Sequence, residues 1–294
     1  MGFECYHPAI NFIYFVSVIA AGIIFKQPVF LAIAFISAFI YSVKRNGWRS
    51  LIFNLALIPC IILFGMYYSG YHHFGATVLR YNFIENRLTL ESLVYGLTLG
   101  VIVAVFFMWM SVVNSVFTTD KVVYLFGKVS PKLSLFFSIA LRMVPRFKVQ
   151  AKKISTARTA IGKGINQGNI FRRFLNAIKI LSMVITWFLE SLSTISDSMR
   201  SRGYGLKGRS AFSIYRFDNR DRGFVIGIFS CITVLMMGVM LNQTTIFFDP
   251  RISMTPITPM SFVFYFGYLC LCTMPMVLEI IGEIRFKNMR SAVK

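Results

Sequence analysis

Long apolar runs alternate with short polar segments along this chain, a pattern that predicts membrane-spanning helices. A helix needs about 20 largely apolar residues to cross a hydrocarbon core about 30 Å thick. Six stretches fit, of which the first two are short; they are residues 10–25, 29–43, 51–71, 90–117, 223–241 and 262–281. We therefore predict an all-α integral membrane protein with about six transmembrane helices.

The first two stretches are separated by Lys26-Gln27-Pro28. A proline following two polar residues is typical of a turn, because proline fits the start of a helix and interrupts its interior. We expect a tight hairpin of two helices here. Two re-entrant half-helices are the alternative.

The central part of the chain has a different character. Residues 118–222 hold 20 of the 31 Lys and Arg residues and 5 of the 11 Asp and Glu residues. This shift predicts three parts. Residues 1–117 form about four membrane helices, 118–222 a cytoplasmic domain of long amphipathic coupling helices, and 223–294 about two membrane helices with a basic tail.

Composition agrees with a membrane protein. Hydrophobic residues make up 56% of the chain and charged residues only 14%, whereas roughly 25% of residues are charged in an ordinary soluble domain. This excludes a disordered chain and an ordinary soluble domain. The net charge of +20 would suggest nucleic-acid binding in a soluble protein, but here its position relative to the membrane decides its meaning.

Basic residues in short loops and tails predict the orientation, because they accumulate on the cytoplasmic side. Seven fall on the side of the central segment and four on the opposite side. The seven are Lys44, Arg45, Arg49, Arg285, Lys287, Arg290 and Lys294, and the four are Lys26, Arg80, Arg87 and Arg251. We predict a multi-pass plasma-membrane protein with both termini in the cytoplasm.

Two long amphipathic helices are predicted within the central segment. The first spans residues 130–161, with Ser130 as N-cap and Pro131 at the first helical position, and Pro145 should kink it. The second spans about residues 170–202. Glycines follow both helices, at 162 and 164 and at 203 and 205, and are typical helix terminators.

Both predicted helices end in an arginine flanked by small residues. The first ends in Ala157-Arg158-Thr159 and the second in Ser201-Arg202-Gly203. Small neighbours allow close approach to another backbone, and a guanidinium can then pair with a carboxylate. The simpler explanation is that each arginine only complements the helix macrodipole, a contribution of about 0.3 to 1 kcal/mol.

Several motifs resemble one known family, the transmembrane coupling (T) component of energy-coupling factor transporters, which includes the membrane proteins of cobalt and nickel importers. The motifs occur in family order and are flanked by apolar segments. They are Thr118-Thr119-Asp120, Ser138-Ile139-Ala140-Leu141-Arg142-Met143-Val144-Pro145, Ser155-Thr156-Ala157-Arg158-Thr159 and Asp197-Ser198-Met199-Arg200-Ser201-Arg202-Gly203-Tyr204-Gly205. The resemblance covers most of the chain.

The resemblance implies that Arg158 and Arg202 end crossed coupling helices beneath the membrane, each docking in a groove of one of two ABC-type ATPase subunits. The usual triplet in that family is Ala-Arg-Gly, from which this chain departs at Thr159 and Ser201. Both replacements are small, so the departures bear on the fine docking geometry. The resemblance thus assigns ATPase binding to the two triplets, residues 157–159 and 201–203.

The resemblance also implies a third partner and a division of labour. A small substrate-binding membrane subunit would capture a vitamin or a metal ion, and the ATPases would bind and hydrolyse ATP. This chain would then be a non-enzymatic coupler without catalytic residues, cofactor or bound metal.

A second function remains an alternative, namely a membrane-anchored protein whose basic cytoplasmic domain binds nucleic acid or anionic lipid. That function predicts dispersed Lys and Arg with interleaved aromatic residues, and it needs no duplicated helix end. The duplication around Arg158 and Arg202 favours the coupler, and we expect no nucleic-acid partner.

One segment looks like a nucleotide site. Gly203-x4-Gly208-Arg209-Ser210 resembles a phosphate-binding loop in which Arg replaces Lys. Such a loop needs a preceding strand and a following helix so that its amides point at the phosphate, whereas a helix precedes it here. We predict no nucleotide binding by this chain.

Metal-site signals are weak. His72 and His73 are adjacent and cannot face one ion from a helix, so we read them as part of a polar loop. The five cysteines all lie in or beside apolar stretches. Their spacing matches no zinc or redox motif, and they are best read as small hydrophobic residues.

Overall fold

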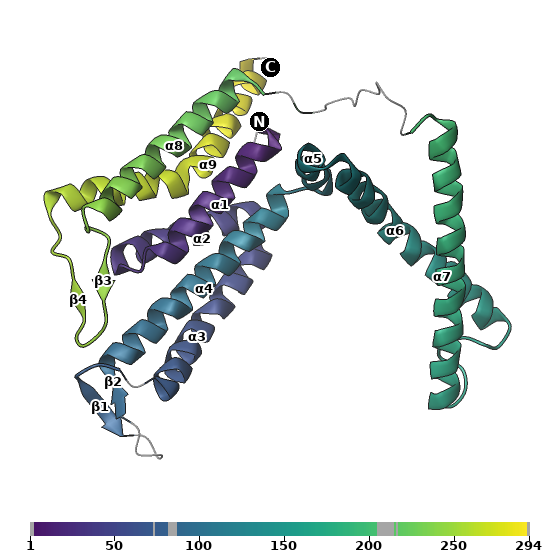
Figure 1. The fold of residues 1–294 in the computed structure, drawn as a ribbon, viewed down its shortest axis with the longest axis horizontal. Helices are drawn as coiled ribbons and strands as arrows, with labels where there is room; N and C mark the ends of the chain where they lie inside the picture. Colours follow the sequence, from purple (N-terminus) through teal and green to yellow (C-terminus); the bar gives the residue numbers. More distant parts are fainter. Residues whose placement is uncertain (1–2, 73, 82–86, 205–214, 216, 293–294) are drawn as a thin grey trace. The chain divides into compact units, whose positions relative to one another are not determined.

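The computed structural model describes residues 3–72, 74–81, 87–204, 215 and 217–292. The chain divides into two compact units (Figure 1). Unit 1 comprises Met1–Thr118 and Tyr215–Lys294, and unit 2 comprises Thr119–Ile214.

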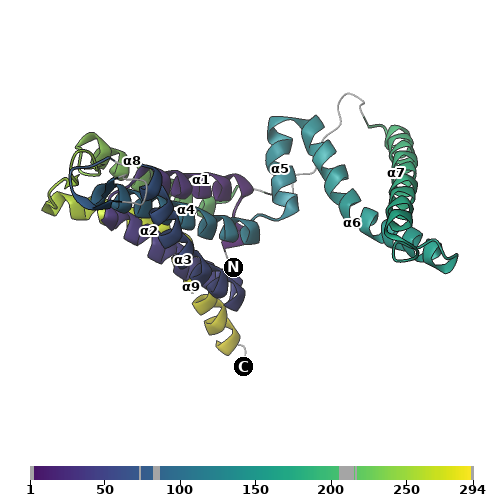
Figure 2. The same ribbon diagram turned by 90° about the horizontal axis from the view of Figure 1, so that it is seen from below.

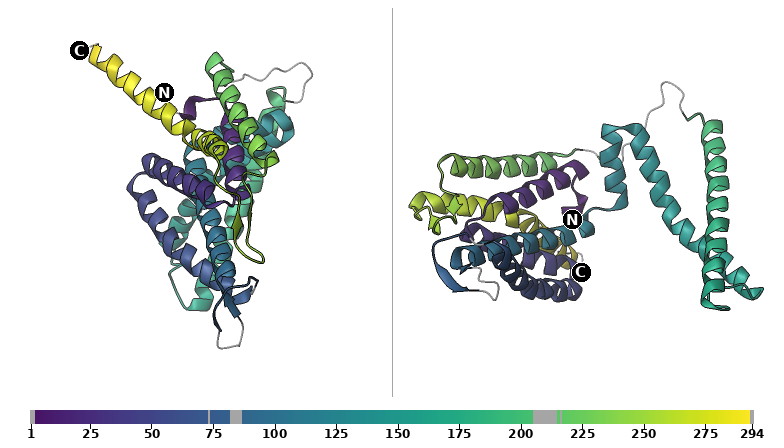
Figure 3. Two further views of the ribbon diagram at one scale, coloured as in Figure 1. Left: turned by 90° about the vertical axis from the view of Figure 1, so that its left-hand side faces the viewer. Right: turned by 60° about the horizontal axis from the view of Figure 1, so that its bottom comes forward.

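Unit 1 is a bundle of helices with two small β-hairpins at one end (Figures 1 and 3). Its helical elements are η1 (Phe3–Cys5), α1 (Pro8–Ile24), α2 (Pro28–Asn46), α3 (Trp48–Tyr71), α4 (Leu90–Val116), α8 (Asn219–Met240) and α9 (Pro259–Ala292). The hairpins pair β1 (Val78–Tyr81) with β2 (Arg87–Thr89), and β3 (Ile246–Phe247) with β4 (Ser253–Met254), both antiparallel.

The prediction of an all-α membrane protein with about six spans is confirmed, but the six apolar helices are not the predicted set. Among the described residues, six helices are long and apolar enough to cross a membrane, namely α2, α3, α4, α7, α8 and α9. Helix α1 is apolar but has only 17 residues. Helix α7 (Ile170–Ser201), predicted as amphipathic, qualifies because an 18-residue window contains at most two charged residues.

Proline and glycine define the first helix boundaries. Pro28 occupies the first turn of α2, so the expected turn separates α1 from α2. His7 caps α1, and its Nδ1 accepts a hydrogen bond from the Ala9 amide at 3.2 Å. Gly47, with φ of +68°, ends α2 and allows α3 to begin one residue later. Local sequence signals are therefore sufficient to locate these helix ends.

The core of unit 1 is aromatic. Trp109 of α4 is fully buried, and its ring lies 6.2 Å from Tyr14 of α1 and 6.0 Å from Tyr41 of α2, centroid to centroid. Phe15 lies 6.3 Å from the same ring. Aromatic pairs at such tilted and edge-on distances add to the stabilisation from burial, so one residue of α4 ties together the first two helices.

Helices α3 and α4 approach closely through glycine. A Cβ atom at Gly96 would lie 2.9 Å from the Gly65 carbonyl oxygen, and one at Gly100 would lie 3.0 Å from the Ile61 carbonyl oxygen. Gly96 and Gly100 form a G-x-x-x-G pair, which lets membrane helices pack backbone against backbone. The opposite face of α3 is exposed and apolar, as expected for a lipid-facing surface; its exposed residues include Ile52, Phe53, Ile62, Leu63 and Met66.

Two features were not predicted. The first is α5 (Thr119–Val129), whose apolar run of residues 122–126 is only five residues long. The second is the pair of hairpins. The segment that carries the β1–β2 hairpin is tied to α4 by Glu91, whose two carboxylate oxygens each lie 3.3 Å from the Thr77 amide nitrogen that donates to them. The strands of the two hairpins have two to four residues each, too few to show the alternation of apolar and polar residues that predicts a strand.

Candidate functional site

Unit 2 consists of three helices, α5, α6 (Pro131–Ala160) and α7 (Ile170–Ser201). Helix α5 packs on the start of α6 (Figure 2). The rings of Phe126 and Phe137 lie 4.8 Å apart, and the Ser134 hydroxyl donates to the Val123 carbonyl oxygen at 3.1 Å. Ser130 occupies the predicted N-cap position of α6, but its side chain makes no capping hydrogen bond.

Helices α6 and α7 cross each other (Figure 1). The rings of Phe147 and Phe188 lie 4.7 Å apart, and Arg158 Nη1 lies 4.0 Å from Met183 Sδ. These contacts are 11 residues apart on α6 but only 5 apart on α7. If the two helices packed along their whole length, two successive contacts would be separated by similar numbers of residues on both helices. The unequal separations indicate that α6 and α7 are in contact over a limited crossing region.

The loop between the crossed helices is closed by side-chain amides. Asn176 Nδ2 of α7 donates to the Gly164 carbonyl oxygen at 3.1 Å, and Gln167 Oε1 accepts from the Gly164 amide at 2.8 Å. Gln167 Nε2 also donates to the Thr159 carbonyl oxygen at 3.4 Å. These bonds hold the end of α6 against the first turns of α7.

Helix α6 ends in a Schellman motif. Gly162 has φ of +71°, and its amide donates to the Thr159 carbonyl oxygen at 3.1 Å, while the Lys163 amide donates to the Arg158 carbonyl oxygen at 2.9 Å. This pair of bonds defines the motif and satisfies carbonyls that would otherwise lack partners. Arg158 is therefore the third helical residue from the end.

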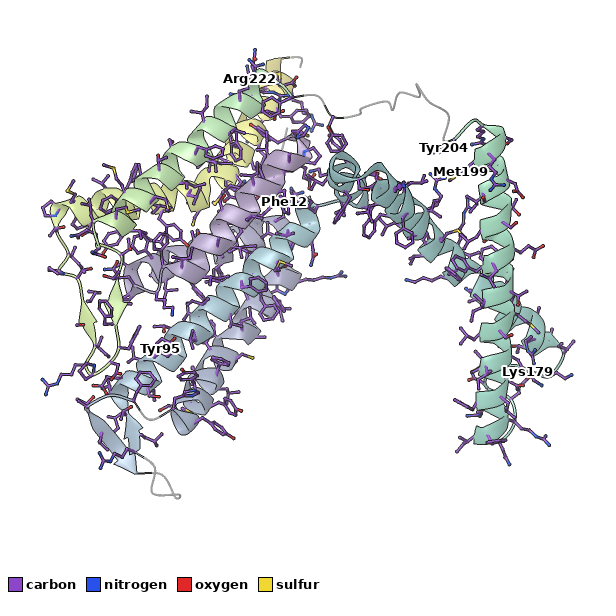
Figure 4. All side chains as sticks on the ribbon, viewed as in Figure 1. Phe12, Tyr95, Lys179, Met199, Tyr204 and Arg222 are labelled. Carbon is purple, nitrogen blue, oxygen red and sulfur yellow. The ribbon has the colours of Figure 1, made fainter. Side chains whose placement is uncertain are left out.

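Helix α7 ends in the same motif, but its arginine occupies another position. Gly203 has φ of +73°. Its amide donates to the Arg200 carbonyl oxygen at 3.0 Å, and the Tyr204 amide donates to that of Met199, also at 3.0 Å. Figure 4 labels Met199 and Tyr204, which lie near each other at this end. The position equivalent to Arg158 is thus Met199, and Arg202 is the capping residue itself.

The environments of the two arginines differ accordingly. Arg158 is only 8% exposed; besides Met183, its side chain contacts the Lys163 carbonyl oxygen, with Nε donating at 3.4 Å. Arg202 is exposed, and among the described residues its side chain makes no hydrogen bond or ion pair. Ala157 and Thr159 are exposed beside Arg158, as is Ser201 beside Arg202, whereas Gly203 is half-buried.

The charge balance of unit 2 is one-sided. Residues 121–189 contain 13 Lys and Arg and no Asp or Glu. Although Asp120, Glu190 and Asp197 also belong to unit 2, Arg158 forms no ion pair among the described residues that would neutralise its largely buried charge. Burying an unpaired charge is costly, and an acidic group supplied from outside the chain would relieve that cost.

Unit 2 also exposes much apolar surface along α7. Phe171 is 73% exposed, Phe174 63% and Leu181 59%, whereas only Ile180 and Val184 of this helix are buried hydrophobic residues. Large contiguous apolar patches usually mark interaction sites. The crossing with α6 covers only a part of α7.

Two motifs noted in the sequence gain no support as binding sites. Residues 205–210 of the phosphate-loop-like segment and His73 lie outside the described residues. His72 stacks on Tyr68 with ring centroids 4.2 Å apart. Among the described residues, no group of three or more His, Cys, Asp or Glu side chains could hold a metal ion.

No family model matches the chain, but individual proteins do. It is 25% identical over 221 residues to the energy-coupling factor transporter transmembrane protein EcfT 1 of Listeria monocytogenes, covering 69% of this chain and 79% of that protein. It is 35% identical over 94 residues to EcfT of Lacticaseibacillus paracasei and 31% identical over 107 residues to EcfT of Brevibacillus brevis.

The chain is a relative of the EcfT proteins. Its matches to the last two EcfT proteins cover 31% and 36% of this chain and 34% and 40% of theirs, so the alignment spans well under half of those EcfT proteins. Together with the six apolar helices, the EcfT matches support a multi-pass membrane protein. None of these EcfT relatives is named as a protein that binds nucleic acid or lipid.

Sequence reasoning missed one cluster in this EcfT relative. Glu279, buried in α9, accepts a hydrogen bond from Tyr41 and lies near Arg45. An acidic residue inside the last apolar stretch was the available signal, because ionisable residues within membrane segments are uncommon and have partners.

Proposed function

We propose that this chain is the transmembrane subunit of an energy-coupling factor transporter. Two partner ATPase subunits hydrolyse ATP, and unit 2 passes their movement to a small substrate-binding membrane subunit that captures a vitamin or a metal ion. The single observation that carries this proposal is the crossing of α6 and α7, each of which ends in a Schellman motif beside an arginine. The names of the EcfT relatives support the same function.

The two helix ends suit ATPase docking. At each end an arginine stands next to small residues, so a groove on a partner can approach the backbone closely. Among the described residues, neither the Arg202 nor the Arg158 guanidinium forms an ion pair with a carboxylate. Each would be satisfied by a groove carboxylate, because a guanidinium binds carboxylates in a planar, two-pronged geometry.

The exposed apolar face of α7 supports docking of the substrate-binding subunit. Such a membrane protein presents apolar helices, and contact with Phe171, Phe174 and Leu181 would remove their exposed side chains from water. Each buried side chain of this kind contributes about 1.5 to 3 kcal/mol. Core packing within unit 2 does not account for them, because α6 crosses α7 only once.

The proposed assembly is tested by purifying a tagged chain from its native membrane and identifying the proteins that copurify. Two ABC-type ATPase chains and one small membrane protein should be retained. Uptake assays with labelled water-soluble vitamins, Co²⁺ and Ni²⁺ would then identify the cargo. Purification without any ATPase, under conditions that retain the small membrane protein, would contradict the proposal.

The topology follows from the same assignment, with unit 2 and both termini in the cytoplasm. A cysteine replacing exposed Lys163 should not react with an impermeant maleimide in intact cells, provided that the five native cysteines have been replaced. It should react after permeabilisation. The predicted topology places the loop of the β3–β4 hairpin on the outer side of the membrane. A cysteine replacing exposed Ile252 in this loop should therefore react in intact cells. Labelling of residue 163 from outside would reverse the topology.

The isolated chain should not hydrolyse ATP. The phosphate-loop-like segment after α7 follows a helix instead of a strand and has Arg209 at the position of the usual Lys. Phosphate release by the purified chain should equal the background of a mock preparation, and adding the ATPase subunits should restore it. Turnover that persists after quantitative removal of those subunits would overturn this prediction.

A further inference from the structure

The chain passes between the units at two places. It leaves unit 1 after Thr118 and re-enters at Tyr215. Helix α4 ends at Val116 and α5 begins at Thr119, so only Phe117 and Thr118 connect the last turn of α4 to the first helix of unit 2. On the return path, the first turn of α8 begins at Asn219, shortly after the re-entry point.

Arg45, in the last turn of α2, binds the end of α4, where the chain leaves unit 1. Its Nε donates to Ser115 Oγ, in the last turn of α4, at 3.1 Å. Its Nη1 lies 3.5 Å from Glu279 Oε1 of α9, and its Nη2 pairs with Glu4 of η1. Tyr41 donates its hydroxyl to the same Glu279 oxygen at 3.1 Å. These five residues form a cluster that we call the root clamp.

The N-terminal segment, residues 3–7, connects this cluster to the start of α8, where the chain returns to unit 1. The rings of Phe3 and Tyr6 lie 5.5 and 5.3 Å from Phe224 in the first turns of α8, and the His7 ring lies 5.8 Å from Phe217, just before that helix. Figure 4 labels Phe12, near the start of α1, and Arg222, near the start of α8. The segment of residues 3–7 thus contacts the start of α8 directly and the end of α4 through Arg45.

The Arg45–Glu279 pair of the root clamp is shielded from solvent, whereas Glu4 is more exposed. Glu279 is 5% exposed and the Arg45 side chain 19%, against 45% for the Glu4 side chain. A buried ion pair is screened little by salt, and removing one partner is destabilising because the other charge is left buried and unpaired. Asn46 reinforces the joint, because its Nδ2 donates to Ser111 Oγ at 2.9 Å, one turn before Ser115. The end of α4 is therefore held at two successive turns.

We propose that the root clamp is the fixed joint through which movement of unit 2 reaches the membrane helices, with Arg45 as its positioning residue. This inference rests on the proposed function. Without the joint, movement driven by the ATPases would bend the chain near Thr118 and Tyr215 instead of displacing α2, α4 and α9. Arg45 would act through its contacts with Ser115, Glu279 and Glu4.

The test uses the complete complex, purified with its ATPase subunits and placed in lipid nanodiscs. Spin labels on cysteines at exposed Tyr71 in α3 and exposed Lys179 in α7 report the distance between the units with and without ATP. We expect Arg45→Met to retain the ATPases and to hydrolyse ATP at the wild-type rate, yet to lose most of the ATP-dependent shift in distance. Arg49→Met, an exposed arginine at the same end, should behave as wild type.

Four outcomes would contradict the inference or the proposed function on which it rests. A wild-type shift in Arg45→Met overturns the inference. If that variant does not assemble, Glu4→Gln and Ser115→Ala, each of which removes one contact, take its place, and unchanged shifts in both overturn it. A wild-type complex that holds its ATPases but shows no ATP-dependent shift overturns it while leaving the proposed function intact. If the wild-type chain retains no ATPase, the result contradicts the proposed function itself.

Discussion

Replacing Arg158 and Arg202 together with glutamate should abolish retention of the ATPase subunits on the tagged chain and stop uptake. Each substitution removes a guanidinium and adds a negative charge opposite the expected groove carboxylate. Leaving a partly desolvated charge unpaired costs about 2 to 5 kcal/mol at an interface. Helix capping alone would cost less than about 1 kcal/mol, so the size of the loss separates docking from capping.

Single substitutions at Arg202 give the clearest reading. Its side chain is exposed and makes no hydrogen bond or ion pair among the described residues, so Arg202→Ala should leave the crossed helices intact and weaken ATPase retention. Arg202→Glu should be worse and Arg202→Lys intermediate, because lysine offers a point charge where a planar fork is expected. Arg158→Ala should also loosen the helix crossing, since Arg158 lies against Met183.

Two matched substitutions control for a general effect of charge. Arg142 and Arg146 on α6 are exposed and lie at least 12 residues before Arg158, away from the end of that helix. Arg142→Glu and Arg146→Glu together change the net charge by the same amount as the double variant, and the complex should keep its ATPases. Full retention and normal uptake by the double glutamate variant at Arg158 and Arg202 would sink the docking assignment.

A leucine at Gly96 should strongly destabilise unit 1. A Cβ atom there would lie 2.9 Å from the Gly65 carbonyl oxygen and 3.0 Å from Tyr68 Cβ, and the backbone of α3 cannot yield without parting the two helices. Overpacking typically costs 1 to 3 kcal/mol, and sometimes more. The temperature at which half of the detergent-solubilised protein remains monodisperse should fall clearly below the wild-type value.

Gly70 provides the matched control on α3, because a Cβ atom there meets nothing within 4 Å. Gly70→Leu should keep the wild-type midpoint, while Gly96→Ala should fall between wild type and Gly96→Leu. Equal midpoints for Gly96→Leu and Gly70→Leu would show that α3 and α4 do not pack through their glycines.

The sequence by itself determined most of the helices and where they end. Apolar runs of the right length must become helices in lipid, because every backbone polar group has to be satisfied within the segment. Pro28, Gly47, Gly162 and Gly203 then mark boundaries through their restricted or left-handed backbone conformations. These are local properties of the chain, so one sequence suffices to read them.

Only the tertiary structure decided how the two arginine-bearing ends differ. Both have the same small-residue setting in the sequence, yet Arg158 lies three residues before the cap and Arg202 is the cap. An offset of three residues moves a side chain by about 4.5 Å along the axis and turns its direction. One guanidinium is thereby buried against α7 and the other left exposed.

The root clamp was beyond reach of the sequence, and the crossing of α6 and α7 was implied only by the resemblance to a known family, without the residues that meet there. Tyr41 and Glu279 are 238 residues apart, and Arg158 and Met183 meet only because their helices cross. Such contacts depend on which helix faces pack together, which is a property of the whole bundle. No local pattern of apolar and polar residues encodes that choice, whereas backbone hydrogen bonding encodes each helix separately.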